Sequence, residues 1–171
     1  QVQKESKARV AAYNRWRPHI HVDYHEQGYN EPYYFAPASR PFHKAITQWQ
    51  IDFQKTVGRN NAGAFDDRGW LYFTGEVFDL FYPSYGDTWP LFNGAIGMTY
   101  EQGGITAGLA VETSGGDTLT LAERIAHHTT TGLATVGTAS ENHEKLKKEF
   151  RNYFNTTAEE GNGPYDGYVI R

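Results

Sequence analysis

The 171-residue sequence contains no cysteine, no run of basic residues and no long apolar stretch. The lack of cysteine excludes disulfides and thiolate metal sites, which leaves histidine and carboxylate side chains as the strong ligands for zinc. Because the net charge is -4 and no basic run is present, we expect neither nucleic acid nor an anionic membrane surface as a partner. No segment stays apolar over the length of a bilayer span, so no membrane association is predicted.

Hydrophobic residues make up 39% of the chain, enough for one buried core, so we expect a single domain or most of one. Aromatic residues are enriched at 15% and gather in residues 33–35 and 78–89. Such clusters suit either a core or an aromatic-lined cleft. The sequence starts at Gln1, without an initiator methionine or a signal peptide. We therefore expect the chain to be a piece of a longer protein.

Residues 19–25, HIHVDYH, alternate polar and apolar side chains in the manner of a β-strand. Because side chains alternate along a strand, His19, His21, Asp23 and His25 are predicted to share one face. The apolar residues between them would pack against the core. A helix is expected over residues 4–16, and Pro18 separates it from the strand.

Apolar residues recur at helical spacing from Phe42 to Val57, which predicts an amphipathic helix with Ser39 as its N-cap and its end within residues 58–61. The other expected elements are a loop at 28–37, a strand at 70–73, a long loop at 78–90, a strand at 95–101, a helix opened by a Thr120–Glu123 capping box and running towards 136, a helix from Ser140 to about 154, and a polar tail at 155–171.

Helices that alternate with strands predict an α/β fold with a mixed, largely parallel sheet flanked by helices. Ligands of such sheets bind beyond the carboxyl ends of strands. His25 and Glu101 are both expected at such ends, which makes them candidates for a shared site.

Three segments, VDYHEQG (22–28), FYPSYGD (81–87) and GMTYEQGG (97–104), resemble the second half of a zinc carboxypeptidase of the carboxypeptidase A type. The resemblance extends along the whole chain, 1–171, as the C-terminal part of the catalytic domain. It implies that His25 binds zinc, that Glu101 is the general base, and that Tyr82 clamps the substrate. It also implies zinc as cofactor, a peptide or protein substrate, and a secreted or periplasmic bacterial protein.

The chemistry explains why such residues are needed. Zinc with an open coordination position activates water and polarises the scissile carbonyl, and a nearby carboxylate takes the proton of that water. The family's first zinc ligands come from an upstream His-x-x-Glu motif, and none precedes His25 here. The chain would therefore supply one zinc ligand of three and is expected to be inactive alone, with an exposed sheet edge that favours self-association.

Several alternatives accompany this interpretation. A non-catalytic aromatic module that binds peptide or glycan needs no zinc ligands. HIHVDYH also resembles the HxHxDH signature of metallo-β-lactamase-like hydrolases, but one extra residue would turn the wrong face toward a metal. Three further predictions concern other residues. Glu112 is a rival for the general base, and Asn14 with Arg15 imitates a carboxylate-binding pair but lies too close to His25. His127 and His128 are expected to be one surface residue and one packing residue.

Overall fold

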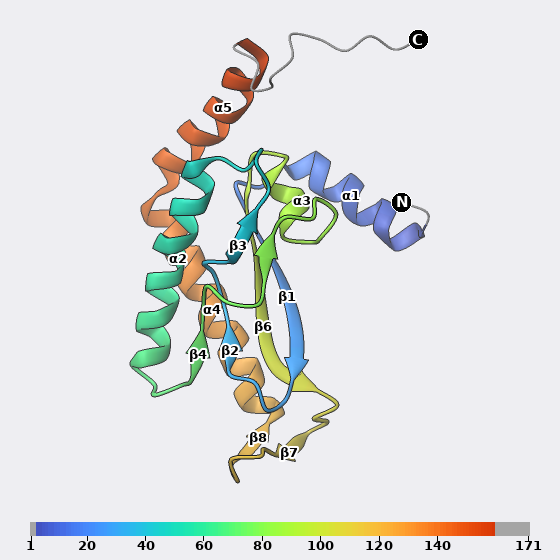
Figure 1. Cartoon of the computed structure of the whole chain (residues 1–171), viewed down its shortest axis with the longest axis vertical. Helices are drawn as coiled ribbons and strands as arrows, with labels where there is room; N and C mark the ends of the chain where they lie inside the picture. Colours follow the sequence, from blue (N-terminus) through green and yellow to red (C-terminus); the bar gives the residue numbers. More distant parts are fainter. Residues whose placement is uncertain (1–2, 160–171) are drawn as a thin grey trace.

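The computed structural model describes residues 3–159, which form a mixed α/β fold (Figure 1). Four strands make the main sheet in the order β1-β6-β2-β4, and two of its three strand pairings are parallel. These strands are β1 (Ile20–Gly28), β6 (Ile96–Ile105), β2 (Tyr33–Tyr34) and β4 (Tyr72–Phe73). The predicted fold class, a mixed and largely parallel sheet flanked by helices, is confirmed.

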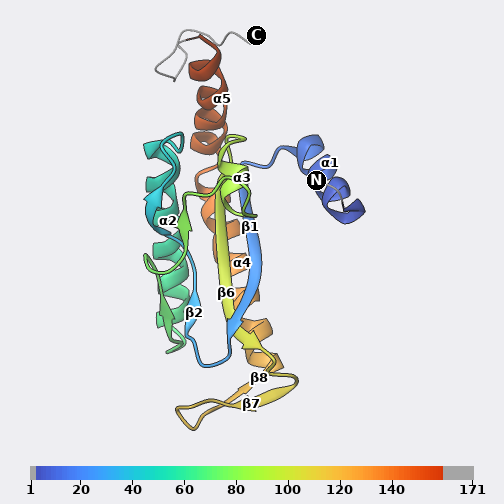
Figure 2. The same cartoon turned by 45° about the vertical axis from the view of Figure 1, so that its right-hand side comes forward.

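Two short strand pairs accompany the main sheet: β3 (Ser39–Phe42) with β5 (Asp79–Leu80), and β7 (Ala110–Glu112) with β8 (Thr118–Thr120). The helices are α1 (Lys4–Trp16), α2 (Gln48–Asp66), α3 (Thr88–Leu91), α4 (Leu121–Glu141) and α5 (His143–Glu159). Figure 2 shows α2 to the left of the β1–β6 pair, α4 behind the pair and α1 to its right. Among residues 3–159, no helix combines the length and the apolar character that crossing a membrane requires.

The helical layer buries one face of β6. Ile96, Met98 and Tyr100 point into the main core, which also holds Phe53 and Val57 of α2. The buried Tyr100 hydroxyl ties the layers together, because it contacts Thr135 Oγ1 at 2.6 Å and accepts from Asn61 Nδ2 at 3.0 Å. Since side chains alternate along a strand, the odd-numbered residues of β6 face away from this core.

The long helix α2 begins later and ends later than predicted. Its N-cap is Thr47, which forms a capping box with Gln50, whereas the expected cap Ser39 lies in β3. The helix also runs through Gly58 to Asp66. Gly58 is kept in the helix by packing, because a Cβ there would overlap the Ala36 carbonyl oxygen. Tertiary contacts thus override the weak helix propensity of residues 58–61.

Other boundaries also shift. The Thr120–Glu123 capping box is confirmed, but α4 continues to Glu141 instead of ending near residue 136. A break at Asn142 then separates α4 from α5, so the last helix starts at His143 and not at Ser140. It reaches Glu159, which places the first part of the predicted polar tail in a helix. The rest of that tail, 160–171, lies outside the described residues.

The two loops with predicted functional interest are partly ordered into elements. Residues 28–37 contain β2, and residues 78–90 contain β5 and most of α3. The short strands in these loops form because they pair with strands that are distant in sequence. β2 pairs with β4 and β6, and β5 pairs with β3. The loop after β5 therefore starts from a fixed point beside the main sheet.

Candidate functional site

His25 and Glu101 lie side by side on the parallel strands β1 and β6. They are register partners, and His25 Nδ1 is 3.7 Å from Glu101 Oε1. Both residues belong to the odd-numbered face that points away from the helical layer. Their 76-residue separation in sequence thus becomes direct contact. Both strands continue beyond this pair, to Gly28 and Ile105, so the two side chains lie within the strands and not at the predicted ends.

The pair lines a cavity of about 390 Å³, which we call the site cavity. One wall is the sheet, and the opposite wall is the segment from Val77 to Asp87. Its lining residues carry four carboxylates and one imidazole and no lysine or arginine: Asp23, His25, Val77, Phe78, Asp79, Tyr85, Gly86, Asp87, Thr99 and Glu101. This composition makes the interior of the cavity electronegative.

Glu101 is buried, with 6% of its surface exposed. Burial raises the pKa of its carboxyl, the His25 ring opposes this shift, and the neighbouring Asp23 and Asp87 carboxylates add to it. Burial also raises the pKa of Asp87, against hydrogen bonds from Thr99 and Thr88. A carboxylate whose pKa is raised is a stronger proton acceptor than an ordinary carboxylate, because it binds the proton more tightly.

Asp23 holds the other side of the His25 ring. Its Oδ2 lies 3.1 Å from His25 Nε2, so the two ring nitrogens face two different carboxylates. Two residues apart on one strand, Asp23 and His25 necessarily share a face. Gly86 covers Asp23 closely, because a Cβ at Gly86 would overlap Asp23 Oδ2. The loop backbone therefore helps to hold the carboxylate against the ring.

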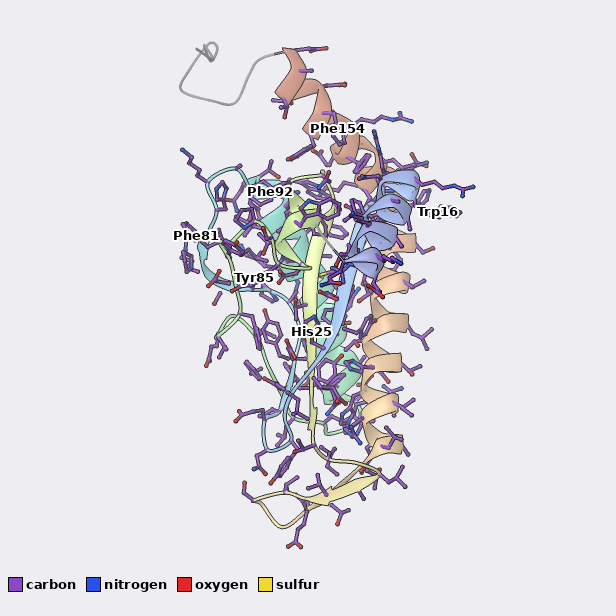
Figure 3. All side chains as sticks on the ribbon, turned by 90° about the vertical axis from the view of Figure 1, so that its right-hand side faces the viewer. Trp16, His25, Phe81, Tyr85, Phe92 and Phe154 are labelled. Carbon is purple, nitrogen blue, oxygen red and sulfur yellow. The ribbon has the colours of Figure 1, made fainter. Side chains whose placement is uncertain are left out.

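The structure separates the two tyrosines of the aromatic loop. Tyr82, the predicted clamp, is 54% exposed and is not among the residues that line the site cavity. Its ring packs against Tyr85 with centroids 5.3 Å apart, and Tyr85 does line the cavity. Figure 3 shows Tyr85 and Phe81 on the same side of the molecule. Tyr82 can therefore reach a ligand in this conformation only through Tyr85 or after movement of the loop.

A complete zinc site needs three protein ligands. Within residues 3–159, no group of three or more histidine, aspartate or glutamate side chains is arranged to hold a metal ion. His25 is the one imidazole that lines the site cavity, and both of its nitrogens already face carboxylates. The described residues alone therefore do not fit a three-ligand zinc site.

The secondary candidates lie elsewhere. Glu112 is exposed on β7 and does not line the site cavity. Asn14 and Arg15 are exposed on α1 and do not line it either. Neither position brings a side chain to the His25–Glu101 pair.

His127 and His128 are both packing residues, which corrects the prediction that one of them lies on the surface. The His127 ring packs on Trp70 and its Nδ1 lies 2.8 Å from Gln102 Oε1. His128 Nδ1 lies 2.7 Å from the Tyr33 hydroxyl, and the His128 side chain also hydrogen-bonds the backbone of His25. The positions of the two histidines in the helix sequence do not reveal these contacts, because their partners lie in segments distant in the chain.

Comparison with known proteins adds no assignment. No protein-family model matches the sequence, and searches of curated proteins and of solved structures found no match.

Proposed function

We propose that this chain contributes the general base and one metal-binding imidazole to a zinc-dependent peptidase that cleaves next to a free carboxyl terminus. The observation that carries the proposal is the direct contact of His25 with Glu101 across the β1–β6 register. The three sequence segments that resemble zinc carboxypeptidases support it, because two of them meet at this contact and the third forms the facing wall of the site cavity.

Glu101 has the environment that a general base requires. It is buried beside an imidazole, it faces the site cavity, and its raised pKa makes it a stronger base than an ordinary glutamate. In the proposed reaction, Glu101 takes a proton from the attacking water and passes it to the leaving amine. His25 keeps one nitrogen toward Glu101, while Asp23 orients the ring from the other side.

Zinc is the proposed cofactor, and when bound it would activate the water and polarise the scissile carbonyl. His25 would be its one ligand from the described residues, so the remaining ligands must come from another part of the complete protein. The outer edge of β1 is the natural place for that part, because β1 ends the order of the main sheet among the described strands. We propose that the same open edge leads the isolated chain to self-associate.

Tyr82 is proposed to position the substrate through movement of the aromatic loop, since it is exposed and borders Tyr85 of the cavity wall. The substrate is a peptide or protein. We place the complete protein in a secreted or periplasmic compartment, on the resemblance of its segments to bacterial secreted peptidases.

Two substitutions of matched chemistry test the proposal in the complete protein. Glu101→Gln should lower hydrolysis of acylated peptides with a free carboxyl terminus by about 10²–10⁴-fold, the range expected for loss of a general base. Glu112→Gln, on the exposed β7, should leave the rate unchanged. Equal rates for wild type and Glu101→Gln would remove the base assignment.

Zinc binding provides the second arm of the test. Calorimetry should show tight zinc binding only by the complete protein, and His25→Ala should abolish it. Zinc binding by the 171-residue chain alone, unaffected by His25→Ala, would contradict the role of His25.

A second candidate function rests on the exposed aromatic segment beside the cavity. Val77, Phe81, Tyr82 and Tyr85 are each at least 54% exposed, as in a non-catalytic module that binds peptide or glycan. This function would be favoured if the protein binds peptide while neither Glu101→Gln nor His25→Ala changes the rate of peptide hydrolysis.

A further inference from the structure

The Glu101 carboxylate is held in the site cavity without a hydrogen bond. Among the described residues 3–159, its nearest charged partner is His25, whose Nδ1 is 3.7 Å away. The backbone of Glu101, in contrast, is fixed on both sides, because it pairs with His25 on β1 and with Tyr34 on β2. The position of the carboxylate therefore depends on the strand that carries it.

Both neighbours of Glu101 on β6 are tied to α4 from the opposite face of the sheet. Since side chains alternate along a strand, Tyr100 and Gln102 point toward the helical layer. The Tyr100 hydroxyl lies 2.6 Å from Thr135 Oγ1, and Gln102 Oε1 lies 2.8 Å from His127 Nδ1. Tyr100 and Gln102 are both buried, and buried polar groups are costly to leave unpaired. The two contacts thus hold β6 directly before and directly after the proposed base.

The contact of α4 with Gln102 is the more critical of the two, because two glycines follow it. Gly103 and Gly104 continue β6 without a side chain that could fix the strand. Tyr100 has a second partner, since Asn61 Nδ2 also donates to its hydroxyl at 3.0 Å. Loss of the Gln102 contact should therefore free the strand near the base more than loss of the contact between Tyr100 and α4.

The His127 ring is fixed in place and in one protonation state. It packs edge-on against Trp70, with ring centroids 4.3 Å apart. Burial lowers the pKa of His127, so the ring is neutral at pH 7. Gln102 Nε2 donates to the Gly103 carbonyl, which leaves Gln102 Oε1 to face the ring as an acceptor. The neutral His127 must then carry its proton on Nδ1.

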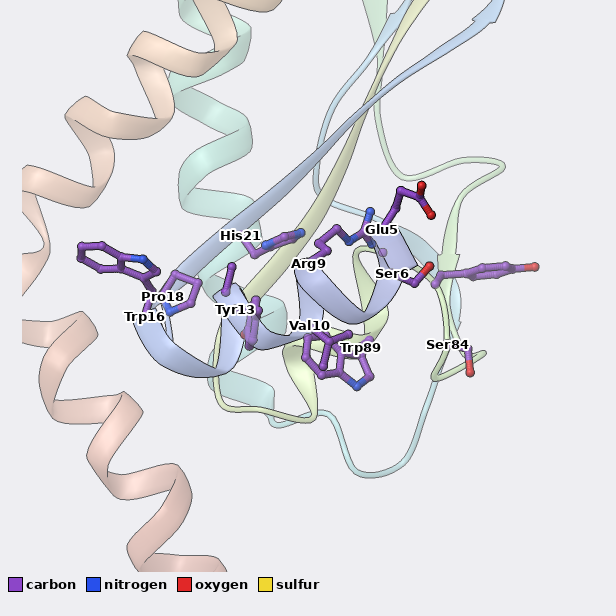
Figure 4. Close-up of a pocket in the computed structure, with 13 residues that line it drawn as sticks. Glu5, Ser6, Arg9, Val10, Tyr13, Trp16, Pro18, His21, Ser84 and Trp89 are labelled. Carbon is purple, nitrogen blue, oxygen red and sulfur yellow. The ribbon is translucent and has the colours of Figure 1, made fainter. Parts of the chain in front are cut away.

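His21 shows what a ring contact without such a donor does. It is half-buried like His127, but its ring points into the pocket beneath α1, where it packs on Tyr13 at 5.6 Å (Figure 4). Within the described part of the chain, no hydrogen bond joins the His21 side chain to β6. Aromatic packing fills space there, whereas the His127 ring adds a directed donor next to Glu101.

We propose that His127 is a positioning residue, which holds Glu101 against His25 by fixing Gln102, the next residue of β6. The inference rests on the proposed function, because it concerns the proposed general base. It gives the His127 Nδ1 proton a role that the packing of the ring on Trp70 does not require.

Two substitutions at residue 127 separate the donor from the packing. His127→Asn keeps a donor near the Nδ1 position, and His127→Phe keeps a ring against Trp70 without a donor. His43→Phe is the matched control. The His43 ring also packs edge-on against an aromatic ring, that of Phe92 at 4.9 Å, and its Nδ1 also takes part in a hydrogen bond, with the backbone of Ala45.

The first readout is NMR of the 171-residue chain. The ¹⁵N ring shifts of the wild type should show His127 with its proton on Nδ1. The ¹³C shift of the Glu101 side-chain carboxyl, assigned by its loss in Glu101→Gln, should move in His127→Phe and return toward the wild-type value in His127→Asn. His43→Phe should leave this shift in place.

The second readout is the rate of the complete protein. His127→Phe should lower kcat by about 10–100-fold with little change in KM, as expected when a catalytic group is misplaced while the substrate still binds. His127→Asn should recover most of this loss, because the donor is restored. A rise in KM at unchanged kcat would contradict a role in placing the base.

The NMR outcomes decide the role of His127 separately from the catalytic proposal. A wild-type His127 with its proton on Nε2 overturns the positioning role, and this measurement needs no variant to fold. A Glu101 carboxyl shift that stays unchanged in His127→Phe overturns it as well. Full activity of Glu101→Gln would remove the base assignment and leave the structural effect of His127 on the carboxylate intact.

Discussion

Asp23 Oδ2 lies 3.1 Å from His25 Nε2, on the opposite side of the ring from the Nδ1 that faces Glu101. A carboxylate this close to Nε2 favours the tautomer of the neutral imidazole that carries its proton on Nε2. The other nitrogen, Nδ1, which faces Glu101, then keeps a lone pair, as the proposed role of zinc ligand requires. The contact makes Asp23 a positioning residue for His25.

Asp23→Asn should therefore weaken the preference of neutral His25 for a proton on Nε2, which the ¹⁵N chemical shifts of the ring report directly. In the complete protein we expect zinc affinity or activity to fall by about 10–100-fold, the usual cost of losing such a partner. Asp79→Asn is a suitable control, because Asp79 lines the same cavity but its Oδ1 accepts from the backbone of Phe81. Unchanged ring shifts in Asp23→Asn would contradict the role.

Glu101→Gln should make the metal-free chain more stable at pH 7. The folded-state pKa of Glu101 is raised, so the folded protein binds this proton more tightly than the unfolded chain does. The resulting stability is present below the ordinary glutamate pKa and is lost as the pH rises through the folded-state pKa. Urea unfolding at pH 4 and pH 7 should thus show an advantage of Glu101→Gln only at pH 7.

Glu112→Gln serves as the control for this pH dependence, because Glu112 is exposed on β7. It should follow the wild-type profile at both pH values. A wild-type chain whose stability rises across the same window, relative to Glu101→Gln, would show that Glu101 is stabilised as a carboxylate.

Gly86→Ala should disturb the site without adding a charge. Its Cβ would overlap Asp23 Oδ2, so either the loop or the Asp23 side chain must move. We expect a loss of about 1–3 kcal/mol in the free energy of unfolding, typical of overpacking, together with altered His25 ring shifts. Gly63→Ala is the matched control: no atom lies within 4 Å of its Cβ position in α2, and it should stabilise the chain by about 0.5–1 kcal/mol.

Gln50→Met should cost about 2–3 kcal/mol of unfolding free energy, because buried carbonyls would lose their donor. Gln50 is 1% exposed, and its Nε2 donates to Leu91 O and Ala95 O at 2.8 Å each. These bonds join α2 to the end of α3 and to the residue before β6, the strand that carries Glu101. Gln48→Ala, at an exposed position of the same helix, should change stability by less than about 0.5 kcal/mol in urea unfolding.

His25 and Glu101 could be proposed from sequence because each lies in a short segment with an informative pattern, VDYHEQG and GMTYEQGG. Alternation in residues 19–25 placed Asp23 and His25 on one face, and the structure confirms this arrangement. The sequence predicts that the segment 81–87 takes part in the site through Tyr82, but the tyrosine that lines the cavity is Tyr85, because the loop folds with Gly86 over Asp23. The packing role of His128 could not be predicted from sequence either, because its hydrogen bonds go to Tyr33 and to the backbone of His25, which are distant in the chain.

Local chemistry in the sequence determined where several elements form: α1 at residues 4–16, the alternating strand around Val22, and the helix opened by the Thr120–Glu123 capping box. These depend on contacts between residues close in the chain, which propensity and spacing record. Tertiary structure alone decided the β1–β6 register, the burial of Glu101 and the tyrosine that lines the cavity. Each of these depends on backbone pairing or desolvation between segments distant in sequence, and their free energy is gained only when those segments pack together.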